Sequence, residues 1–308
     1  MSLITVGTVA FDAIETPFGS SGKIVGGAAS YIGLSASQFV EQQYIISVIG
    51  EDFPESFVQE LEGRGIRTAG LERRPGEKSF YWAGKYHLDM NSRDTLATEL
   101  NVLADFQPKV PADARNADYV MLGNLDPNVQ ASVLDQMESR PKLIVLDTMN
   151  FWMDIALEPL KEVIKRIDVL TINDEEARQL SGEHSLVKAA HKILKMGPTT
   201  LVIKKGEHGA LLFNNDEVFF APALPLEEVL DPTGAGDTFA GGFIGYIAHT
   251  QDISFNNMKR GVVLGSALAS FTCEKFGTER LLELTEEELD ERIQRFVDLV
   301  DFDIILKD

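Results

Sequence analysis

Short apolar runs alternate along the chain with amphipathic segments, and glycines stand at many of the junctions. The apolar runs have the length and composition of β-strands, while the segments between them have helical periodicity. Parallel strands need a long crossover between them, and a helix usually provides it. The alternation therefore predicts an α/β fold, in which a mostly parallel sheet carries helices on both faces.

Strands are expected at residues 4–9, 44–49, 119–122, 143–146, 169–172, 201–204 and 210–213. Helices are expected at residues 28–40, 54–63, 128–140, 158–166, 175–181, 186–196, 235–249, 256–271 and 285–300. The segment 79–102 breaks this alternation. Its polar and aromatic residues indicate short antiparallel strands, which form either a flap over a ligand or a hairpin on the sheet edge. No linker or repeat divides the chain, so residues 1–308 are expected to form one domain.

Composition narrows the classes of partner. The 308 residues include 28 Lys and Arg against 48 Asp and Glu, which gives a net charge of −20. Such a surface repels phosphate backbones and anionic lipids, so neither nucleic acid nor membrane is expected as a partner. Cys273 is the single cysteine, which excludes an intramolecular disulfide and favours a cytoplasmic location. No signal peptide and no membrane-spanning stretch is expected.

The most informative run is Asp231–Gly242, read Asp-Pro-Thr-Gly-Ala-Gly-Asp-Thr-Phe-Ala-Gly-Gly. Its first glycines precede a predicted helix, where unpaired backbone N–H groups and the helix dipole bind anions. Asp237 falls in the first turn, where a carboxylate can take a proton from an attacking hydroxyl. A helix cap alone would explain a short Gly-Ala-Gly-Asp, but the whole run favours catalysis. Walker A, G-x-G-x-x-G, H-E-x-x-H and G-x-S-x-G motifs are all absent.

This run resembles the C-terminal signature of the PfkB, or ribokinase-like, family of carbohydrate and nucleoside kinases. The resemblance implies a ribokinase-like three-layer α/β/α sandwich with a small β lid, built from segments at about 12–23 and 79–102. It further implies that Asp237 is the catalytic base. The amides of Gly234, Ala235 and Gly236 would form the anion hole for the transferred phosphoryl group.

A second landmark, Gly26-Gly27-Ala28-Ala29-Ser30, resembles the N-terminal di-glycine signature of the family. The resemblance implies that Gly26 and Gly27 let a substrate hydroxyl approach the backbone. Asp12 matches a family aspartate that binds substrate hydroxyls, although turn capping also explains it. Tyr31 stands where the family usually has a sugar-binding Asn, so a ribokinase-type contact is not expected there.

The tetrapeptide Asn173-Asp174-Glu175-Glu176, after a predicted strand, is similar to the family motif N-x-x-E. The resemblance implies that Glu176 organises Mg²⁺ through water and that Asn173 lies near the phosphates of ATP. Oxygen ligands and retained waters suit Mg²⁺. A helix cap followed by dipole-favoured acids is the alternative explanation.

The run Lys204-Lys205-Gly206-Glu207-His208-Gly209 is similar to the family turn that faces the nucleotide. The resemblance implies that Lys204 and Gly206 approach ATP and that Gly209 shapes the turn, whereas a plain β-hairpin explains both glycines. Gly265 and Ala269 fall where family members line the adenine pocket. Close helix packing explains these two residues equally well.

The resemblance also implies two further sets of residues. Asp231, Thr233 and Gly277 correspond to a monovalent-cation site, so K⁺ is a candidate cofactor beside ATP and Mg²⁺. Asp126, after the strand 119–122, falls near an acidic substrate ligand, and Asn150 is expected at the end of a strand facing the substrate.

The expected activity is transfer of the γ-phosphoryl group of ATP to a hydroxyl of a sugar or polyol. A nucleoside kinase is the alternative, because aromatic rings near the expected site could stack on a base: Phe11, Tyr31, Tyr81, Trp82 and Tyr86. A catalytically silent ligand-binding protein of the same fold is a third interpretation. A homodimer is a candidate assembly, since lid-to-lid dimers occur in the family.

Overall fold

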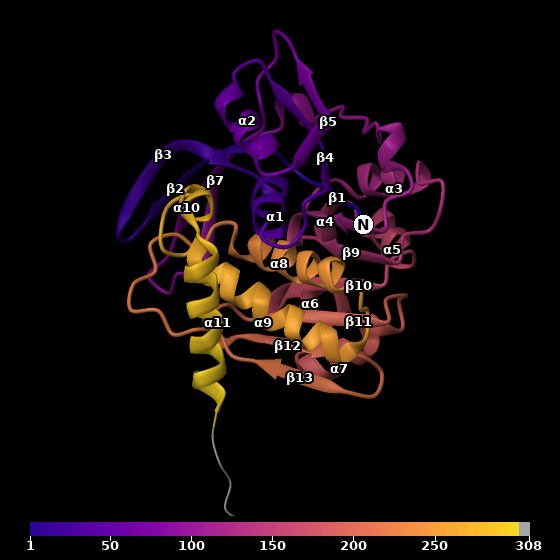
Figure 1. Ribbon diagram of the computed structural model, residues 1–308, viewed down its shortest axis with the longest axis vertical. Helices are drawn as coiled ribbons and strands as arrows, with labels where there is room; N and C mark the ends of the chain where they lie inside the picture. Colours follow the sequence, from indigo (N-terminus) through magenta and orange to yellow (C-terminus); the bar gives the residue numbers. More distant parts are fainter. Residues whose placement is uncertain (302–308) are drawn as a thin grey trace, which may run out of the picture.

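The computed structural model describes residues 1–301, and they form a central sheet of nine strands (Figure 1). Its order is β13-β12-β11-β10-β9-β8-β1-β4-β5, and the last two strands of the chain, β12 and β13, form the antiparallel edge. The strands are β1 (Leu3–Val6), β4 (Gln43–Gly50), β5 (Ile66–Arg74), β8 (Tyr119–Leu122), β9 (Leu143–Asp147), β10 (Val169–Asn173), β11 (Thr200–Lys204), β12 (Ala210–Phe213) and β13 (Val218–Ala221). The end of the expected domain, residues 302–308, lies outside the described part.

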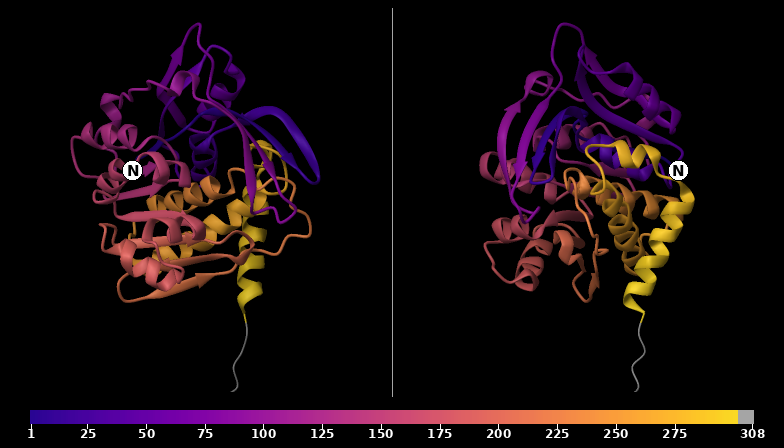
Figure 2. Two further views of the ribbon diagram at one scale, coloured as in Figure 1. Left: turned by 180° about the vertical axis from the view of Figure 1, so that it is seen from behind. Right: turned by 90° about the vertical axis from the view of Figure 1, so that its left-hand side faces the viewer.

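Helices cover both faces of this sheet, as the rear view in Figure 2 also shows. One layer contains α1 (Ala28–Ala36), α8 (Ala235–Thr250) and α9 (Phe255–Thr272). The opposite layer contains α3 (Pro127–Asp135), α5 (Leu157–Ile164), α6 (Asp174–Ser181) and α7 (Leu186–Leu194). The remaining helices are α2 (Glu55–Gly63), α4 (Asn150–Ile155), α10 (Glu279–Glu283) and α11 (Glu286–Val300). The architecture is therefore an α/β/α sandwich.

Alternation along the strands explains the two cores. In β8, Val120 and Leu122 enter the core beneath α3 and α5, while Tyr119 and Met121 enter the core beneath α8. Successive side chains of a strand point to opposite faces. Because both faces are covered, the central strands are mostly apolar, and all four residues of β8 are buried.

A separate sheet of four strands stands beside the sandwich as a lid, in the order β3-β2-β6-β7. It combines the hairpin of β2 (Ala10–Thr16) and β3 (Gly19–Gly26) with that of β6 (Tyr81–Tyr86) and β7 (Arg93–Glu99). Strands β2 and β6 pair in parallel, which joins two segments that are far apart in the sequence. The segments 12–23 and 79–102, from which a lid was expected, both fall within this sheet or its flanks.

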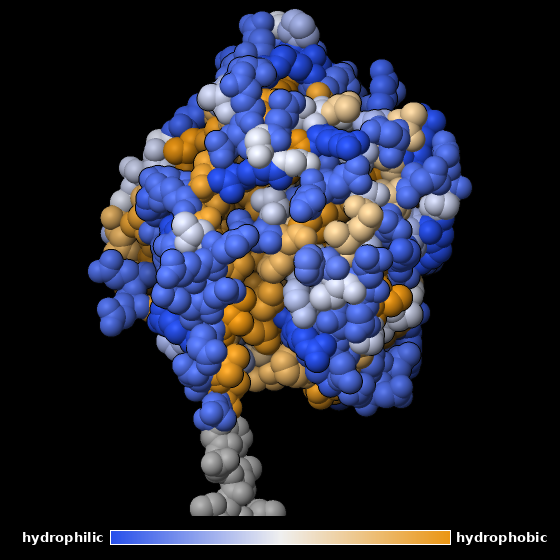
Figure 3. All heavy atoms as spheres, viewed as in Figure 1, coloured by the Kyte–Doolittle hydropathy of each residue, from blue (hydrophilic) through white to orange (hydrophobic). Residues whose placement is uncertain are grey.

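Some elements differ from the expectations. The first strand ends at Val6 rather than residue 9, and the helix expected at 128–140 ends at Asp135. The pattern also missed β5, whose charged residues suit its position at the sheet edge, and the short helices α4 and α10. No helix within residues 1–301 is long and apolar enough to cross a bilayer. Hydrophobic side chains are visible between α11 and the rest of the face in Figure 3.

Candidate active site

The N-terminus of α8 forms the centre of the candidate site. Gly234 is the N-cap residue and adopts a left-handed conformation with φ of 77°. A Cβ atom at this position would overlap the Tyr31 ring, so the turn requires glycine on two grounds. A helix start leaves N–H groups available to an anion. Of the three amides predicted to form the anion hole, that of Ala235 donates to the Pro232 carbonyl at 3.1 Å. Asp237 lies in the first turn beside them, as expected from the sequence.

The Asp237 carboxyl group has weakened acidity. Burial raises its pKa to about 7, and the charge of Asp147 acts in the same direction. The cations Lys204 and Arg93 oppose this shift. A carboxyl group with a pKa near neutrality is suited to accept a proton from a hydroxyl and release it again.

Asp12 on β2 lies next to the di-glycine turn. Its Oδ2 accepts a hydrogen bond from the Gly27 N–H at 3.3 Å, and a Cβ at Gly26 would overlap the carboxylate. Gly27, with φ of 92°, caps α1. Burial raises the pKa of Asp12 to about 7, and the charges of Asp231 and Asp237 add to the shift. Asp12 and Asp237 therefore share one electrostatic environment, although they belong to the lid and the sandwich respectively.

Tyr31 on α1 lies beside the start of α8. The residue is 1% exposed, and its ring packs against Gly234. Its hydroxyl is buried without a hydrogen-bond partner among the described residues. Burial raises the pKa of Tyr31 well above its usual value, and the charges of Asp12, Asp231 and Asp237 act in the same direction. The hydroxyl thus stays protonated and can donate a hydrogen bond to a bound ligand.

Three polar residues end neighbouring parallel strands at the same edge of the sheet. They are Asp147 on β9, Asn173 on β10 and Lys204 on β11. The Lys204 Nζ atom lies 2.6 Å from Asp147 Oδ2, and the two side chains are only 16% and 5% exposed. Burial lowers the pKa of Lys204, but the charges of Asp147 and Glu176 outweigh it and raise the pKa overall. The ammonium group therefore keeps its charge inside the site.

Asn173 and Glu176 form a capping box at the start of α6. Asn173 Oδ1 accepts the Glu176 N–H at 2.8 Å, and Glu176 Oε2 accepts the Asn173 N–H at 2.8 Å. Glu176 is 5% exposed, and burial raises its pKa to about 7, with the Asp147 charge adding to the effect. The helix-cap interpretation thus holds for both residues, and it leaves Glu176 Oε1 outside the capping box.

The tip of the lid reaches the turn that was expected to face the nucleotide. Gly206 begins the short 3₁₀ helix η3 (Gly206–His208) with φ of 54°, and a Cβ there would lie 2.5 Å from Asn91 Oδ1. Asn91 belongs to the turn between β6 and β7. Gly209, with φ of 79°, closes the same turn through a hydrogen bond from the Lys205 N–H to its carbonyl at 2.8 Å.

Arg93 and Tyr86 connect the lid to the site. The Arg93 guanidinium lies 5.9 Å from the centre of the Trp82 ring and 6.0 Å from that of Tyr86. Its positive charge opposes the rise in the pKa values of Asp237 and Glu176 that burial causes. The Thr233 hydroxyl donates to the Tyr86 hydroxyl at 3.2 Å. The lid therefore contributes a cation and aromatic rings next to the α8 cradle.

Other predicted residues have structural partners. Asp231 is fully buried, and its two oxygens accept the N–H groups of Thr233 and Gly277 at 2.8 and 3.3 Å. These three residues do come together, and their role in cation binding remains a prediction. Gly265 allows α9 to approach α8, since a Cβ would lie 2.6 Å from the Phe239 carbonyl oxygen. Ala269 packs on the core between these helices.

Asp126 and Asn150, which were predicted to lie near the substrate, are both found at the N-terminus of a helix. Asp126 caps α3, with Oδ1 accepting the Asn128 N–H at 2.7 Å. Asn150 does not end a strand, which corrects the expectation: β9 ends at Asp147, and Asn150 begins α4, donating to Gln179 Oε1 at 2.5 Å. The side chain at the strand end is therefore Asp147.

Sequence reasoning missed Asp147 and Asn91. Asp147 follows the predicted strand 143–146 directly, and ligands bind at the carboxyl ends of parallel strands, so its position could have identified it. Asn91 could not be found, because its neighbour Gly206 is distant in the sequence.

The residues present fit ATP and Mg²⁺ in chemical type. The start of α8 offers backbone N–H groups to a phosphate, and the carboxylates of Glu176 and Asp147 are hard oxygen donors. Within residues 1–301, no three His, Cys, Asp or Glu side chains are close enough to hold a metal by themselves. Mg²⁺ usually keeps several waters and phosphate ligands, which agrees with such an arrangement.

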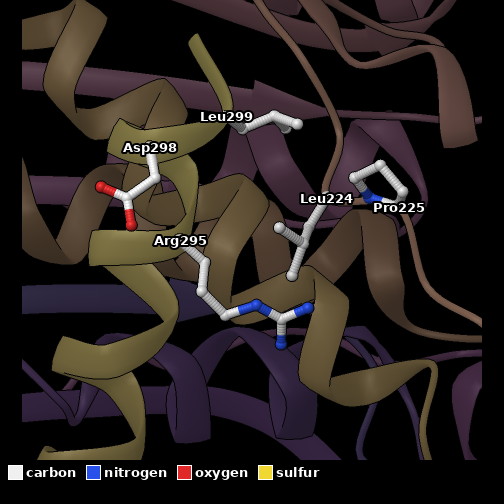
Figure 4. Close-up of a pocket in the computed structure, with 5 residues that line it drawn as sticks. All are labelled: Leu224, Pro225, Arg295, Asp298 and Leu299. Atoms are coloured by element: carbon white, nitrogen blue, oxygen red, sulfur yellow. The ribbon is translucent and has the colours of Figure 1, made fainter. Parts of the chain in front are cut away.

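A surface pocket of about 390 Å³ lies elsewhere, between α11 and the segment after β13 (Figure 4). Arg295, Asp298 and Leu299 line it from the helix, with Leu224 and Pro225 opposite. It contains none of the predicted site residues.

An anion cradle at a helix start, an adjoining proton acceptor and a lid above them define a phosphotransferase that acts on a hydroxyl acceptor. The chain belongs to the pfkB family of carbohydrate kinases, whose family model matches residues 5–284.

Individual relatives differ in substrate. Cytidine kinase of Thermococcus kodakarensis is 29% identical over 250 residues, which cover 79% of this chain and 87% of the relative. The nucleoside kinase of Methanocaldococcus jannaschii has a similar structure, with a TM-score of 0.76 and 21% identity over 96% of this chain and 99% of the other. An Escherichia coli protein described as Ribokinase II, in complex with ATP and Mg²⁺, gives a TM-score of 0.77 at 19% identity over 96% and 99% of the two chains. The ribokinase-like fold is thereby established.

Proposed function

We propose that this kinase transfers the γ-phosphoryl group of ATP to a hydroxyl of a sugar or polyol, with Asp237 as the general base. One observation carries the proposal: Asp237, with a pKa of about 7, lies in the first turn of α8, directly after the Gly234–Gly236 cradle. The E. coli relative in complex with ATP and Mg²⁺ supports both as cofactors. The cytoplasmic location expected from the sequence is part of this proposal.

In the proposed reaction, Asp12 and the Tyr31 hydroxyl hold the acceptor beside Asp237. Asp237 takes the proton as the acceptor oxygen bonds to the γ-phosphorus, and the bond to the β-phosphate oxygen breaks to release ADP. The amides of Gly234 and Gly236 and the Lys204 ammonium stabilise the charge on the phosphoryl oxygens. When bound, Mg²⁺ offsets phosphate charge, and Glu176 would hold it through water.

Tyr31 supports a small acceptor, because its ring takes up space beside Gly234 at the start of α8. A nucleoside kinase is the second candidate. The names of two relatives favour it, and so do the rings of Trp82 and Tyr86 beside Arg93 on the lid. A K⁺ site at Asp231, Thr233 and Gly277 and a homodimer both stay predictions.

The test is a phosphorylation screen of sugars, polyols and nucleosides with Mg·ATP, comparing wild type with Asp237→Asn. We expect one substrate class to give turnover that the variant loses. Turnover with nucleosides alone would favour the second candidate. A protein that binds these ligands without ADP formation would contradict the catalytic proposal.

A further inference from the structure

The Lys204–Asp147 ion pair spans the width of a strand. Asp147 ends β9 and Lys204 ends β11, and β10 lies between them in the sheet. Asp147 is opposite Thr171 and Lys204 is opposite Asn173, so the lysine stem must cross the end of β10 to reach the carboxylate. The pair is nevertheless short, at 2.6 Å, and nearly buried. A plain β-hairpin between β11 and β12 does not require an ion pair with β9.

The same ammonium group lies against the phosphoryl cradle. A Cβ built on Gly236 would be 3.2 Å from Lys204 Nζ, so the charge sits over the first turn of α8. Its charge also acts on Glu176 and Asp237. One cation therefore stands between the backbone amides that favour an anion and the carboxylates that favour a metal.

We propose that Lys204 is an internal counter-ion, which keeps free divalent cations away from Asp147 and Glu176 and changes its partner from Asp147 to the phosphoryl group when Mg·ATP binds. Without nucleotide, Asp147 is already paired, and a divalent cation would meet the ammonium charge at close range. The γ-phosphate brings negative charge to the α8 cradle, within reach of Lys204. The Asp147 carboxylate is then free to face the metal that arrives with the nucleotide. This inference rests on the proposed phosphate site at α8.

Binding of Mn²⁺ without nucleotide tests the proposal. We expect wild type to show no saturable site below millimolar Mn²⁺ when free Mn²⁺ is followed by electron paramagnetic resonance. Lys204→Met should bind Mn²⁺ at least about tenfold more tightly, because the variant lacks the positive charge beside the carboxylates that repels Mn²⁺. Adding a non-hydrolysable ATP analogue should make wild type bind Mn²⁺ beyond the amount that the analogue chelates in a protein-free control, since Lys204 then has its second partner.

Two variants control for the loss of charge and for folding. Lys205→Met removes the same charge one residue further along the chain, and it should behave like wild type. Lys204→Met leaves the buried Asp147 charge without a cationic partner, although the Thr148 N–H still donates to it, and this destabilises a fold. Lys204→Met/Asp147→Asn removes both charges, should regain the melting temperature, and should lose the gained Mn²⁺ site.

Tight Mn²⁺ binding by nucleotide-free wild type would overturn the proposal, and this measurement does not depend on any variant. A folded Lys204→Met that gains no Mn²⁺ affinity would overturn it as well. Neither measurement requires turnover. A failed substrate screen would therefore count against the proposed function and leave this result standing.

Discussion

Asp237 is the residue on which the proposed chemistry depends. Asp237→Asn keeps the size of the side chain and removes its basicity. We expect kcat to fall by roughly 10²–10⁴-fold, the usual contribution of a general base. The dissociation constant of ATP should change far less, because the cradle is formed by backbone. Steady-state kinetics and equilibrium titration of ATP measure the two effects, and near-normal turnover would rule out this role.

Tyr31 provides a second test at the scale of one residue. Its buried hydroxyl has no hydrogen-bond partner within residues 1–301, and such a group costs about 1–3 kcal/mol. Tyr31→Phe should therefore raise the melting temperature, while kcat/KM falls by the equivalent of about 0.5–1.5 kcal/mol if the hydroxyl binds substrate. Ribose should be a poor acceptor for wild type, since Tyr replaces the family Asn.

Tyr31→Ala is the contrasting variant. It leaves a cavity in the core and should lower the free energy of unfolding by about 3–5 kcal/mol. It should also change the ratios of kcat/KM across acceptors. Unchanged ratios in both variants, together with a lowered melting temperature for Ala, would show that Tyr31 serves packing alone.

The start of α8 shows what one element contributes. Gly236→Val places a Cβ about 3.2 Å from Lys204 Nζ, and the lysine end can move aside. We expect the variant to fold, and kcat to fall by about 10²-fold, because small displacements in a site have effects of this size. Circular dichroism and kinetics test this. Full activity in a folded variant would place the phosphate elsewhere.

Gly234→Ala is the matched comparison on the same turn. Its φ of 77° is unfavourable for alanine, and the new methyl group would meet the Tyr31 ring. It should therefore lower the melting temperature, unlike Gly236→Val.

An element could be predicted where its cause is a pattern within its own residues. Strands such as Tyr119–Leu122 and Ala210–Phe213 were predicted with their observed ends, because burial on both faces makes them continuously apolar. The edge strand Ile66–Arg74 carries charged residues, which interrupt the apolar pattern, and it was missed. The glycine-rich run Asp231–Gly242 predicted that Asp237 lies in the first turn of a helix, and this is its observed position. Contacts between distant segments, such as Lys204 with Asp147, leave no local pattern and could not be predicted.

The stability of the whole molecule should depend on pH through its site. Burial raises the pKa of Asp12 from 3.8 to about 7, so the folded protein binds a proton more tightly than the unfolded chain. This stabilisation is complete below pH 3.8 and is lost as the pH rises through 7. Glu176 and Asp237 shift in the same direction. The melting temperature of the unliganded protein should therefore be lower at pH 8 than at pH 5.5.

Asp12→Asn should reduce this pH dependence, because the amide does not ionise and can still accept from the Gly27 N–H. Each kcal/mol of change in the free energy of unfolding shifts the melting temperature by about 2–4 °C in a protein of this size class. Differential scanning fluorimetry at the two pH values, without ligands, measures the effect. An unaltered difference between the two temperatures would show that Asp12 is not buried as a proton-binding group.

The contact between Asn91 and Gly206 has a consequence for timing. The lid tip lies against the turn proposed to hold ATP. We therefore expect ADP to leave after the same lid movement that frees the phosphorylated product. In many enzymes such an opening, rather than chemistry, limits the rate. Turnover would then slow as sucrose makes the solvent more viscous. Asp237→Asn, limited instead by the transfer step, should be indifferent to viscosity.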